Sequence, residues 1–435
     1  MRRRMGWQGL TATGLLLLSA GCRAPQLPSL PLGQLPSSAR ALQADENPEP
    51  YPGTMPEPTI QVPPRPLRRA PEPTQGNRLQ AFVSPAETLP ALTALIAGAH
   101  HSLYLETFNF GLEGYGRRLV PLLVAKARAG VEVKVVMDYC GSRFLPGHRE
   151  LVQQLQAGGV EVRRYLPRTI RKDDRQVGIN IDHRKLYLAD GQRALVGGVN
   201  LMKSFDTIHQ DILVRFEGPV VSDLYAEFAL NYRAAGGKAK LSLPGVIPGS
   251  GAATAQVVVT SPAEGRFEAR DAILAGLAAA RQRIDIENQY LWDDRVIAAL
   301  HQALARGVRL RVMVPGEEHK RIFKNIHTEE LKRLVDRGAE ARVYHGEPAE
   351  AHLHVKYYQV DDDWVAVGST NADTRAMMDN QELQVVVQDG ALVADLRQRL
   401  FERDWTIHSR PFVYQPPNLF TRPFRSLLEL IDYYL

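Results

Sequence analysis

The chain has 435 residues, of which 44% are hydrophobic and 23% are charged, so it can bury one large core or two smaller ones and is not a disordered polar chain. Its net charge of +5 is compatible with phosphate, nucleic acid or acidic lipid as a partner, although such a surplus is equally typical of a solvated surface. The two cysteines, Cys22 and Cys140, argue against a disulfide framework and a thiolate metal site, and we expect Cys140 to be a small buried apolar residue.

Residues 1–24 have the order of a targeting signal. The arginines Arg2 to Arg4 precede an apolar run from Leu10 to Ala20, which is too short to cross a bilayer as a helix and is typical of a signal peptide. The small residues directly before Cys22 resemble a bacterial lipobox, in which the cysteine is lipidated. We therefore expect an exported lipoprotein, anchored in a membrane of the bacterial cell envelope and facing the periplasm or the cell exterior. Ordinary secretion and an uncleaved anchor are the alternatives.

Residues 25–76 form a proline-rich segment. Of the 29 prolines in the chain, 14 lie between Pro25 and Pro73. Because proline fixes φ and removes a backbone donor, this segment cannot build helices or sheet ladders. The composition predicts an extended, semi-rigid linker between a membrane anchor and a folded body, or a disordered tail.

The folded body repeats itself. VSPAE at 83–87 returns as TSPAE at 260–264, and LYLETFNF at 103–110 returns as IDIENQYL at 284–291. Strands alternate with helices in both copies, which predicts an α/β architecture with mostly parallel sheets. A repeat of about 170 residues indicates duplication of a whole domain rather than a solenoid period. We place the first lobe at residues 77–245 and the second lobe at residues 255–410.

One motif stands at the same place in both copies: His, any residue, Lys, four residues, Asp, six residues, Gly, Gly or Ser, any residue, Asn. An acid follows each histidine by 28 residues. The first copy supplies His183, Lys185, Asp190, Gly197, Gly198, Asn200 and Asp211. The second copy supplies His354, Lys356, Asp361, Gly368, Ser369, Asn371 and Glu382. A single His-x-Lys on a strand is usually an exposed polar face, but two full copies of this pattern make coincidence very small.

The spacing indicates a chemistry. Residues i and i+2 of a strand point to the same face, so each histidine projects together with its lysine. The glycines predict a hairpin that returns beside the strand and brings Asn200 and Asn371 near the lysines. Two imidazoles, two ammonium groups and two amides fit a phosphodiester, since lysines and amides hold non-bridging oxygens while imidazoles perform covalent and proton chemistry. We expect Asp190 and Asp361 to brace the hairpins, and no spacing in the chain indicates a metal site or a cofactor.

These motifs resemble the phospholipase D superfamily. The resemblance implies an α/β fold of two lobes related by pseudo-twofold symmetry, with mixed, mostly parallel sheets, helices on both faces and one shared active site. It implies that one histidine forms a phosphohistidine while the other protonates the leaving alcohol, without a metal, and by analogy we assign His183 as nucleophile and His354 as general acid. It implies that a carboxylate of the same lobe holds each histidine, a role that falls to Asp211 and Glu382 and fixes the imidazole tautomer. Because both half-sites lie in one chain, a monomer suffices.

Two stretches are similar to the bacterial cardiolipin synthase and transphosphatidylase branch of that superfamily: GSTNADTRAMMDNQEL at 368–383 and EGPVV at 217–221. This resemblance implies transfer of a phosphatidyl group from a phospholipid to an alcohol or lipid acceptor, such as phosphatidylglycerol, with hydrolysis as a side reaction. The first copy departs from the branch, with Met202, Ser204 and His209 where the second has Asp373, Arg375 and Asn380. The alternatives are a nuclease and an inactive lipid-binding module. We expect no nucleic-acid partner, because the charge is modest and no long basic stretch with interleaved aromatic residues is present.

Residues 411–435 form a C-terminal extension. After Pro423 the apolar residues recur at helical intervals, which predicts an amphipathic helix. Either this helix packs on the catalytic body, or its apolar face enters the headgroup region of a membrane with Arg422 and Arg425 beside it.

Overall fold

The computed structural model describes residues 60–61, 69–171, 177–203, 205–238, 240–241, 248–316, 321–346 and 351–414. The expected signal with Cys22, most of the proline-rich segment, Ser204 and the expected C-terminal helix lie outside these ranges. Within them, no helix is long and apolar enough to cross a membrane.

The first lobe alternates strands with helices. Its strands in the main sheet are β2 (Thr74–Phe82), β3 (Ser102–Thr107), β4 (Glu132–Asp138), β5 (Glu161–Tyr165), β8 (Leu186–Ala189), β9 (Arg193–Gly197) and β11 (Leu213–Glu217). Its helices are α3 (Pro85–Ala97), α4 (Tyr115–Arg128), α5 (Tyr139–Ser142), α6 (His148–Ala157) and α7 (Val220–Ala234). Strand β2 begins shortly before the expected lobe boundary at residue 77.

The second lobe follows the same order. Its strands are β12 (Ala253–Ser261), β13 (Arg266–Phe267), β14 (Arg283–Asn288), β15 (Arg309–Pro315), β16 (Glu340–Tyr344), β18 (Lys356–Val360), β19 (Trp364–Gly368), β20 (Glu382–Gln388) and β21 (Ser409–Pro411). Its helices are the short turn η1 (Pro262–Glu264), α8 (Glu268–Ala279), α9 (Asp294–Ala305), α10 (Arg321–Val335), α11 (Thr374–Met378), α12 (Gly390–Leu396), the π-helical η2 (Arg397–Glu402) and α13 (Arg403–Thr406). Two small sheets complete the described chain, one of β1 (Ile60–Gln61), β6 (Arg168–Arg171) and β7 (Val177–Asn180), the other of β10 (His209–Gln210) and β17 (His352–Leu353).

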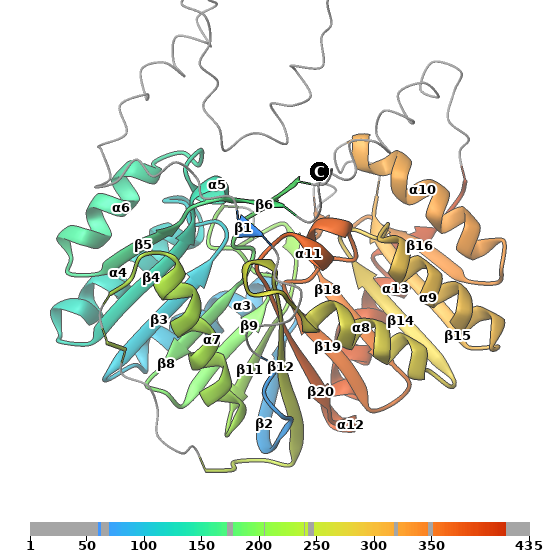
Figure 1. Cartoon of the computed structure of the whole chain (residues 1–435), viewed down its shortest axis with the longest axis horizontal. Coiled ribbons are helices and arrows are strands. Elements are labelled where there is room, and N and C mark those ends of the chain that lie inside the picture. Colours follow the sequence, from blue (N-terminus) through green and yellow to red (C-terminus); the bar gives the residue numbers. More distant parts are fainter. Residues whose placement is uncertain are drawn as a thin grey trace, which may run out of the picture.

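Both lobes share one continuous sheet, in the order β21-β16-β15-β14-β18-β19-β20-β12-β2-β11-β9-β8-β3-β4-β5. Counted outward from the middle, β2-β11-β9-β8-β3-β4-β5 repeats the order β12-β20-β19-β18-β14-β15-β16. The middle strands β2 and β12 pair antiparallel, so the two halves are related by a pseudo-twofold axis that runs between them, as Figure 1 shows. The expected α/β fold of two related lobes is confirmed.

Antiparallel pairs outnumber parallel pairs in this sheet, which differs from the expectation of mostly parallel pairing. The parallel pairs lie within β3-β4-β5 and within β14-β15-β16. The strands that follow each motif instead return through short hairpins, β8 to β9 and β18 to β19, and a short connection permits only antiparallel pairing. Asp190 and Asp361 stand at the two hairpin corners with φ of +56° and +50°, a left-handed conformation that aspartate tolerates better than most residues.

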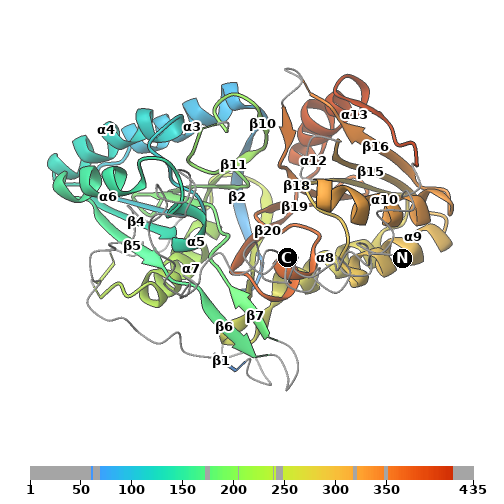
Figure 2. The same cartoon turned by 90° about the horizontal axis from the view of Figure 1, so that it is seen from above.

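Helices cover both faces of the sheet (Figure 2), and their packing joins the lobes. Helix α7 of the first lobe contacts β12 of the second, and α12 of the second lobe contacts β2 of the first. A central hydrophobic cluster accordingly contains side chains of both lobes, such as Phe228 and Phe401, whereas each lobe has a further cluster of its own. The shared core holds the two motifs in a fixed relation.

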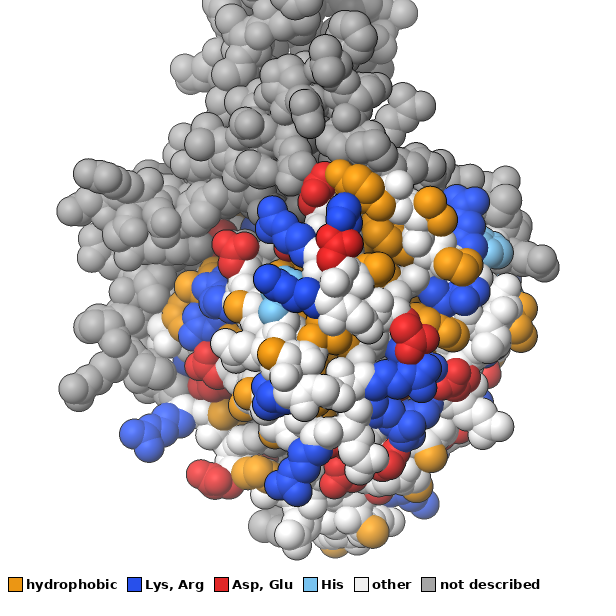
Figure 3. Space-filling model, turned by 90° about the vertical axis from the view of Figure 1, so that its right-hand side faces the viewer, with side chains coloured by type: hydrophobic (Ala, Val, Ile, Leu, Met, Phe, Trp, Pro, Cys, Tyr) orange, Lys and Arg blue, Asp and Glu red, His pale blue; other side chains and the backbone are white. Residues whose placement is uncertain are grey.

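Charged pairs also cross between the lobes. The buried Arg266 Nη1 lies 2.9 Å from Glu227 Oε1, and the half-exposed Arg399 Nη2 lies 2.6 Å from Glu87 Oε2. On the second-lobe side of the molecule, basic and acidic side chains are interspersed (Figure 3).

Cys140 in α5 is half-buried. The expectation that Cys140 is a buried residue is therefore wrong.

Candidate active site

Each motif lies where a strand of the sheet begins. Lys185 directly precedes β8, and Lys356 is the first residue of β18. The Nζ atom of Lys185 donates to the carbonyl oxygen of His183 at 2.5 Å, and Lys356 donates in the same way to His354. The i, i+2 spacing therefore places each lysine beside its histidine. All four side chains are buried, with exposed fractions between 1% and 8%.

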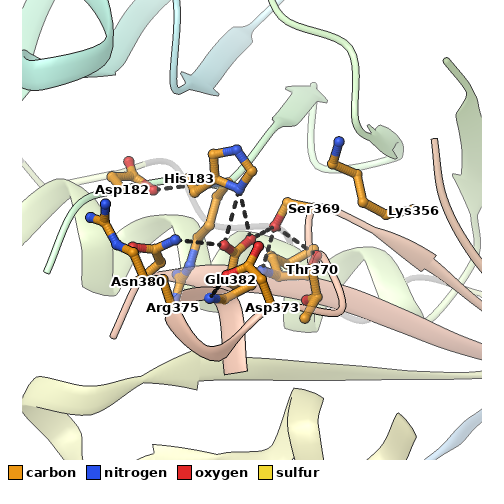
Figure 4. Close-up of polar contacts among 12 residues, drawn as sticks. Asp182, His183, Lys356, Ser369, Thr370, Asp373, Arg375, Asn380 and Glu382 are labelled. Carbon is orange, nitrogen blue, oxygen red and sulfur yellow. Dashed lines mark hydrogen bonds and ion pairs between the residues drawn. The ribbon is translucent and has the colours of Figure 1, made fainter. Parts of the chain in front are cut away.

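Each imidazole is bonded to a carboxylate of the other lobe. His183 Nδ1 lies 3.0 Å from Glu382 Oε1 and 3.1 Å from Oε2, a contact drawn in Figure 4. His354 Nδ1 lies 2.7 Å from Asp211 Oδ2. The expected acids are thus the ones in contact, but the expectation that each histidine is held by a carboxylate of its own lobe is wrong.

Backbone hydrogen bonds between the lobes produce this crossed arrangement. The His354 N–H donates to the carbonyl oxygen of Gln210 at 2.9 Å, within the parallel pair β10 and β17. The His183 N–H likewise donates to the carbonyl oxygen of Gln381 at 2.9 Å. Each histidine is therefore aligned with the residue just before the other lobe's acid. The bonded side chains are 143 and 199 positions apart in the chain, so motif spacing does not reveal the pairing.

The two acids have different supports. Glu382 accepts hydrogen bonds from the Ser369 hydroxyl and, at 3.2 Å, from Asn380 Nδ2 (Figure 4). Asp211 accepts one from the backbone N–H of the next residue, Ile212, at 2.8 Å. Gly198 occupies the position that corresponds to Ser369, and a Cβ atom there would overlap the Asp211 carboxylate. The glycine therefore makes room for the acid, whereas the serine binds the acid.

The two lysines also have different neighbours. Lys185 Nζ lies 5.4 Å from the centre of the Phe108 ring, which in turn lies 5.0 Å from the His183 ring. In the second copy, Gln289 takes the place of Phe108, and Lys356 Nζ donates to its Oε1 at 3.0 Å. These two contacts were not foreseen from sequence. The sequence offered one indication of these contacts: Phe108 and Gln289 directly follow the corresponding strands β3 and β14, whose ends are polar.

Burial dominates the electrostatics of the site. It raises the pKa values of Asp211 and Glu382 to about 7. It lowers the pKa of Lys185 to about 8 and that of Lys356 to about 7. Near pH 7 the two carboxyl groups and the two amino groups are therefore close to their pKa values, and the negative and positive charges in the site are similar in number.

Both histidines are neutral at neutral pH. Burial, followed by the charges of Lys185 and Lys356, holds the pKa of His183 well below its usual value. Burial and then Lys356 do the same for His354, with a smaller effect of Lys185. Because the lysine of each lobe acts on the histidine of the other, the two motifs share one site. A neutral ring that donates its Nδ1 hydrogen to a carboxylate leaves the Nε2 lone pair available as a base or nucleophile.

The remaining motif residues fall into two groups, the asparagines and the aspartates. Asn200 is buried and its Oδ1 accepts the Asn109 N–H at 3.3 Å, while Asn371 is buried with no hydrogen-bond partner for its Oδ1 in the described part of the chain. Asp190 instead caps the loop before β3 through the N–H groups of residues 100–102, and Asp361 caps the loop before β14 through those of residues 281–283. The asparagines therefore remain candidates for substrate contact, whereas both aspartates brace hairpins at the far end of the strands.

A buried charged cluster lies behind His183 and was not foreseen. Asp138 accepts the Asp182 N–H at 2.9 Å, and burial raises the pKa of Asp138 to about 8. Arg184 is fully buried and donates to Gln381 Oε1 at 3.1 Å. Leu353 and Val355 flank the histidine of the second motif instead, so only the first histidine has charged residues directly before and after it in the chain. The difference between the residues that flank the two histidines could have indicated this cluster from the sequence.

No group of three or more His, Cys, Asp or Glu side chains within the described ranges has the geometry of a metal site.

Comparison with known proteins gives a consistent result. Residues 92–231 and 273–405 match the family model described as cardiolipin synthase, phospholipase D-like domain. Cardiolipin synthase B of Escherichia coli (strain K12) is 30% identical over 347 residues, which cover 75% of this chain and 80% of that protein. Cardiolipin synthase A of Pseudomonas entomophila (strain L48) is 30% identical over 333 residues, which cover 75% of this chain and 68% of that protein.

Solved structures share the fold at low identity. The phosphatidylserine synthase of Haemophilus influenzae Rd KW20 superposes with a TM-score of 0.59 at 14% identity and covers 81% of this chain and 92% of its own. The polyphosphate kinase of Porphyromonas gingivalis superposes with a TM-score of 0.50 at 12% identity and covers 82% of this chain and 53% of its own. The two segments of the family match fall on the two lobes.

Proposed function

The chain belongs to the family described as cardiolipin synthase, phospholipase D-like domain, and from this premise we propose that it is a phosphatidyltransferase whose donor is a phospholipid. The acceptor is an alcohol or a second lipid, and water is a competing acceptor that gives hydrolysis. The relatives named cardiolipin synthase support the reaction class. The observation that carries the proposal is the crossed arrangement, in which each buried histidine is oriented by a carboxylate of the other lobe.

The proposed reaction has two halves. In the first, Nε2 of His183 attacks the phosphorus of the donor, a P–N bond forms, and the P–O bond to the leaving alcohol breaks while His354 gives that oxygen a proton. In the second, His354 takes the proton of the acceptor hydroxyl, whose oxygen attacks phosphorus and breaks the P–N bond. Both imidazoles are then restored. The assignment of His183 as nucleophile comes from the resemblance noted in the sequence.

The surrounding groups support this sequence of steps. His354 must be protonated before it can act as an acid. Burial lowers its pKa, and the negative phosphate of a bound donor raises it again. Lys185 and Lys356 are placed to neutralise the non-bridging oxygens as charge develops on them. Glu382 and Asp211 keep the Nδ1 hydrogens in place, so that Nε2 faces the substrate.

A direct assay tests the proposal. Purified full-length chain is incubated with phosphatidylglycerol, and the lipids are separated by thin-layer chromatography. We expect a diphosphatidyl product together with free glycerol, and neither from chains with His183→Ala or His354→Ala. Unchanged lipid together with cleavage of plasmid DNA would replace the proposal by a nuclease. Unchanged lipid and DNA with retained lipid binding would leave an inactive binding module.

The site can be completed by a single chain, since both half-sites belong to one molecule, and we propose that the enzyme works as a monomer. The sequence of residues 1–24 supports export, with Cys22 lipidated as a membrane anchor. Replacement of Cys22 by serine should then release the protein from the membrane fraction of cells, and unchanged fractionation would remove this part of the proposal.

A further inference from the structure

Large apolar side chains are exposed at a few positions in the described part of the chain: Phe144, Leu166, Val335, Ile407 and Val413. Phe144 follows β4 with 61% of its surface exposed, and Leu166 follows β5 with 46% exposed. Ile407 precedes β21, whose Ser409 pairs with the last residue of β16. Three of the five therefore lie at the edge of the sheet where the parallel strands end.

The active site lies at this same edge. Strands β3, β4 and β5 are parallel, and Glu106 near the end of β3 pairs with Leu186, the residue that directly follows Lys185. Val335 ends α10, the helix that returns from β15 toward the start of the strands, and Val413 lies beyond Pro411, which pairs with Arg342 near the start of β16. These two apolar residues lie away from the site and serve as internal controls.

The turn from Tyr139 to Phe144, which we call the α5 turn, is fastened to the residues around His183. Its N-cap, Asp138, accepts the N–H of Asp182, the neighbour of His183, at 2.9 Å. Ser142 Oγ donates to the carbonyl oxygen of Phe108 at 3.0 Å, and the Phe108 ring packs against His183. The turn is therefore a rigid rim of the site, and it lies at the upper edge of the first lobe in Figure 1.

The exposed end of the α5 turn combines an aromatic ring with a cation. The guanidinium group of Arg143 lies 4.4 Å from the centre of the Phe144 ring and 4.8 Å from the centre of the Tyr139 ring. An apolar tip beside a cation matches the acyl chains and phosphates of a lipid surface. A protein partner would need an apolar patch of several hundred Å² on its side of the interface, whereas this rim offers separate single side chains.

We propose that the α5 turn is the contact of this protein with an anionic phospholipid bilayer, in which Phe144 enters the acyl region and Arg143 lies among the lipid phosphates. This inference rests on the proposed function, because a phosphatidyl donor resides in such a bilayer and must reach a buried histidine. It assigns the membrane contact to the rim of the active site, independently of any anchor at Cys22 and of the C-terminal extension.

Depth-dependent quenching tests the insertion directly. Full-length chains with Phe144→Trp and, as control, Val335→Trp are mixed with phosphatidylglycerol vesicles that carry bromine atoms on their acyl chains. After subtraction of the signal of the unmodified chain, which contains four tryptophans, we expect quenching for the residue at 144 alone. Equal quenching at both positions, or none at 144, overturns the proposal even if another segment holds the protein on the vesicle.

A second variant separates binding from chemistry. Phe144→Ser should lower partition into phosphatidylglycerol vesicles by about tenfold, with unchanged activity on a short-chain, soluble phosphatidylglycerol, and Val335→Ser should change neither. Loss of activity on the soluble lipid would show that Phe144 is needed inside the site and would overturn the proposal. If the unmodified chain transfers no phosphatidyl group while position 144 is still quenched, the proposed function fails and the membrane contact stands.

Discussion

The two half-sites present the same reactive groups but hold their acids in different ways. Glu382, the longer acid, reaches across the lobes and is bound by the Ser369 hydroxyl. Asp211, the shorter acid, fills the space that a side chain at Gly198 would need. The acid and the residue beside it therefore differ together between the two copies, and in each copy the carboxylate lies against an imidazole.

The lysines differ in the same manner. Lys185 lies over the ring of Phe108, whereas Lys356 is bonded to Gln289 and lies 2.9 Å from His354 Nδ1. In each motif the lysine is the charge that, after burial, most lowers the pKa of its own histidine. The comparison teaches that a duplicated site can keep the same side chains while their supports diverge, which agrees with our proposal that the two histidines perform different steps.

The largest expected effect comes from the histidines themselves. His183→Ala and His354→Ala should each lower phosphatidyl transfer by at least about a thousandfold, because each imidazole serves an obligatory step. A donor with p-nitrophenol as its leaving group separates them, since this alcohol leaves without a proton. We expect a single burst of p-nitrophenol, about one per site, in His354→Ala, because the P–N bond then forms but is not broken, and no release in His183→Ala. The opposite pattern would make His354 the nucleophile.

Two ion pairs join the lobes, one buried and one half-exposed, and they test how much burial decides the contribution of such a contact to stability. Arg266→Met removes the guanidinium group that lies 2.9 Å from the buried Glu227, with Arg184 remaining at 3.9 Å, and should lower the free energy of unfolding by about 3–5 kcal/mol. Arg399→Met breaks the half-exposed pair with Glu87 and should cost less than about 1 kcal/mol. Urea unfolding measures both. Equal losses would mean that burial does not distinguish these two contacts.

The supports of the acids can be broken one at a time. Gly198→Ala forces a Cβ atom against the Asp211 carboxylate and should lower kcat by about a hundredfold, while Ser369→Ala removes one hydrogen bond to Glu382 and should lower it by about tenfold. Thermal unfolding of both variants is the control for folding. A smaller effect at 198 than at 369 would contradict the view that the glycine makes room for the acid.

The smallest expected effect is on the pH profile. The carboxylates must be ionised to polarise the imidazoles, and burial raises their pKa values to about 7, so activity should fall below neutral pH. The lysines must be protonated to hold the phosphate, and burial lowers the pKa of Lys356 to about 7 and that of Lys185 to about 8, so activity should also fall above neutral pH.

Substitution of the two lysines distinguishes the two half-sites by their effects on the pH profile. Lys356→Arg should move the alkaline limb of kcat/KM upward by about one pH unit, to the limb set by Lys185, because a guanidinium group keeps its proton at these pH values. Lys185→Arg should leave the limb where Lys356 sets it. Equal shifts in both variants would show that the two lysines titrate as one unit.

Much of the fold was accessible from local patterns. The duplication, the hairpins after each motif and the alternation of strands and helices follow from spacing and hydrophobic periodicity, which act over a few residues. The numbers of parallel and antiparallel strand pairs could not be predicted from the sequence, because they depend on which strands lie beside each other in the sheet. The extra strand β21 shows the same limit, since it pairs with β16 from beyond the repeated unit.

The sequence by itself determined the identity of the reactive groups. His183 and His354, their lysines and their two acids all stand in a repeated pattern whose chemistry can be recognised from residue types alone. Only the tertiary structure decided which acid serves which histidine, because Glu382 and Asp211 reach across the lobes through contacts between residues far apart in the chain. It also decided that Gly198 and Ser369 have opposite roles, since burial and close packing, not spacing, determine whether a Cβ atom at that position overlaps the carboxylate or its hydroxyl binds it.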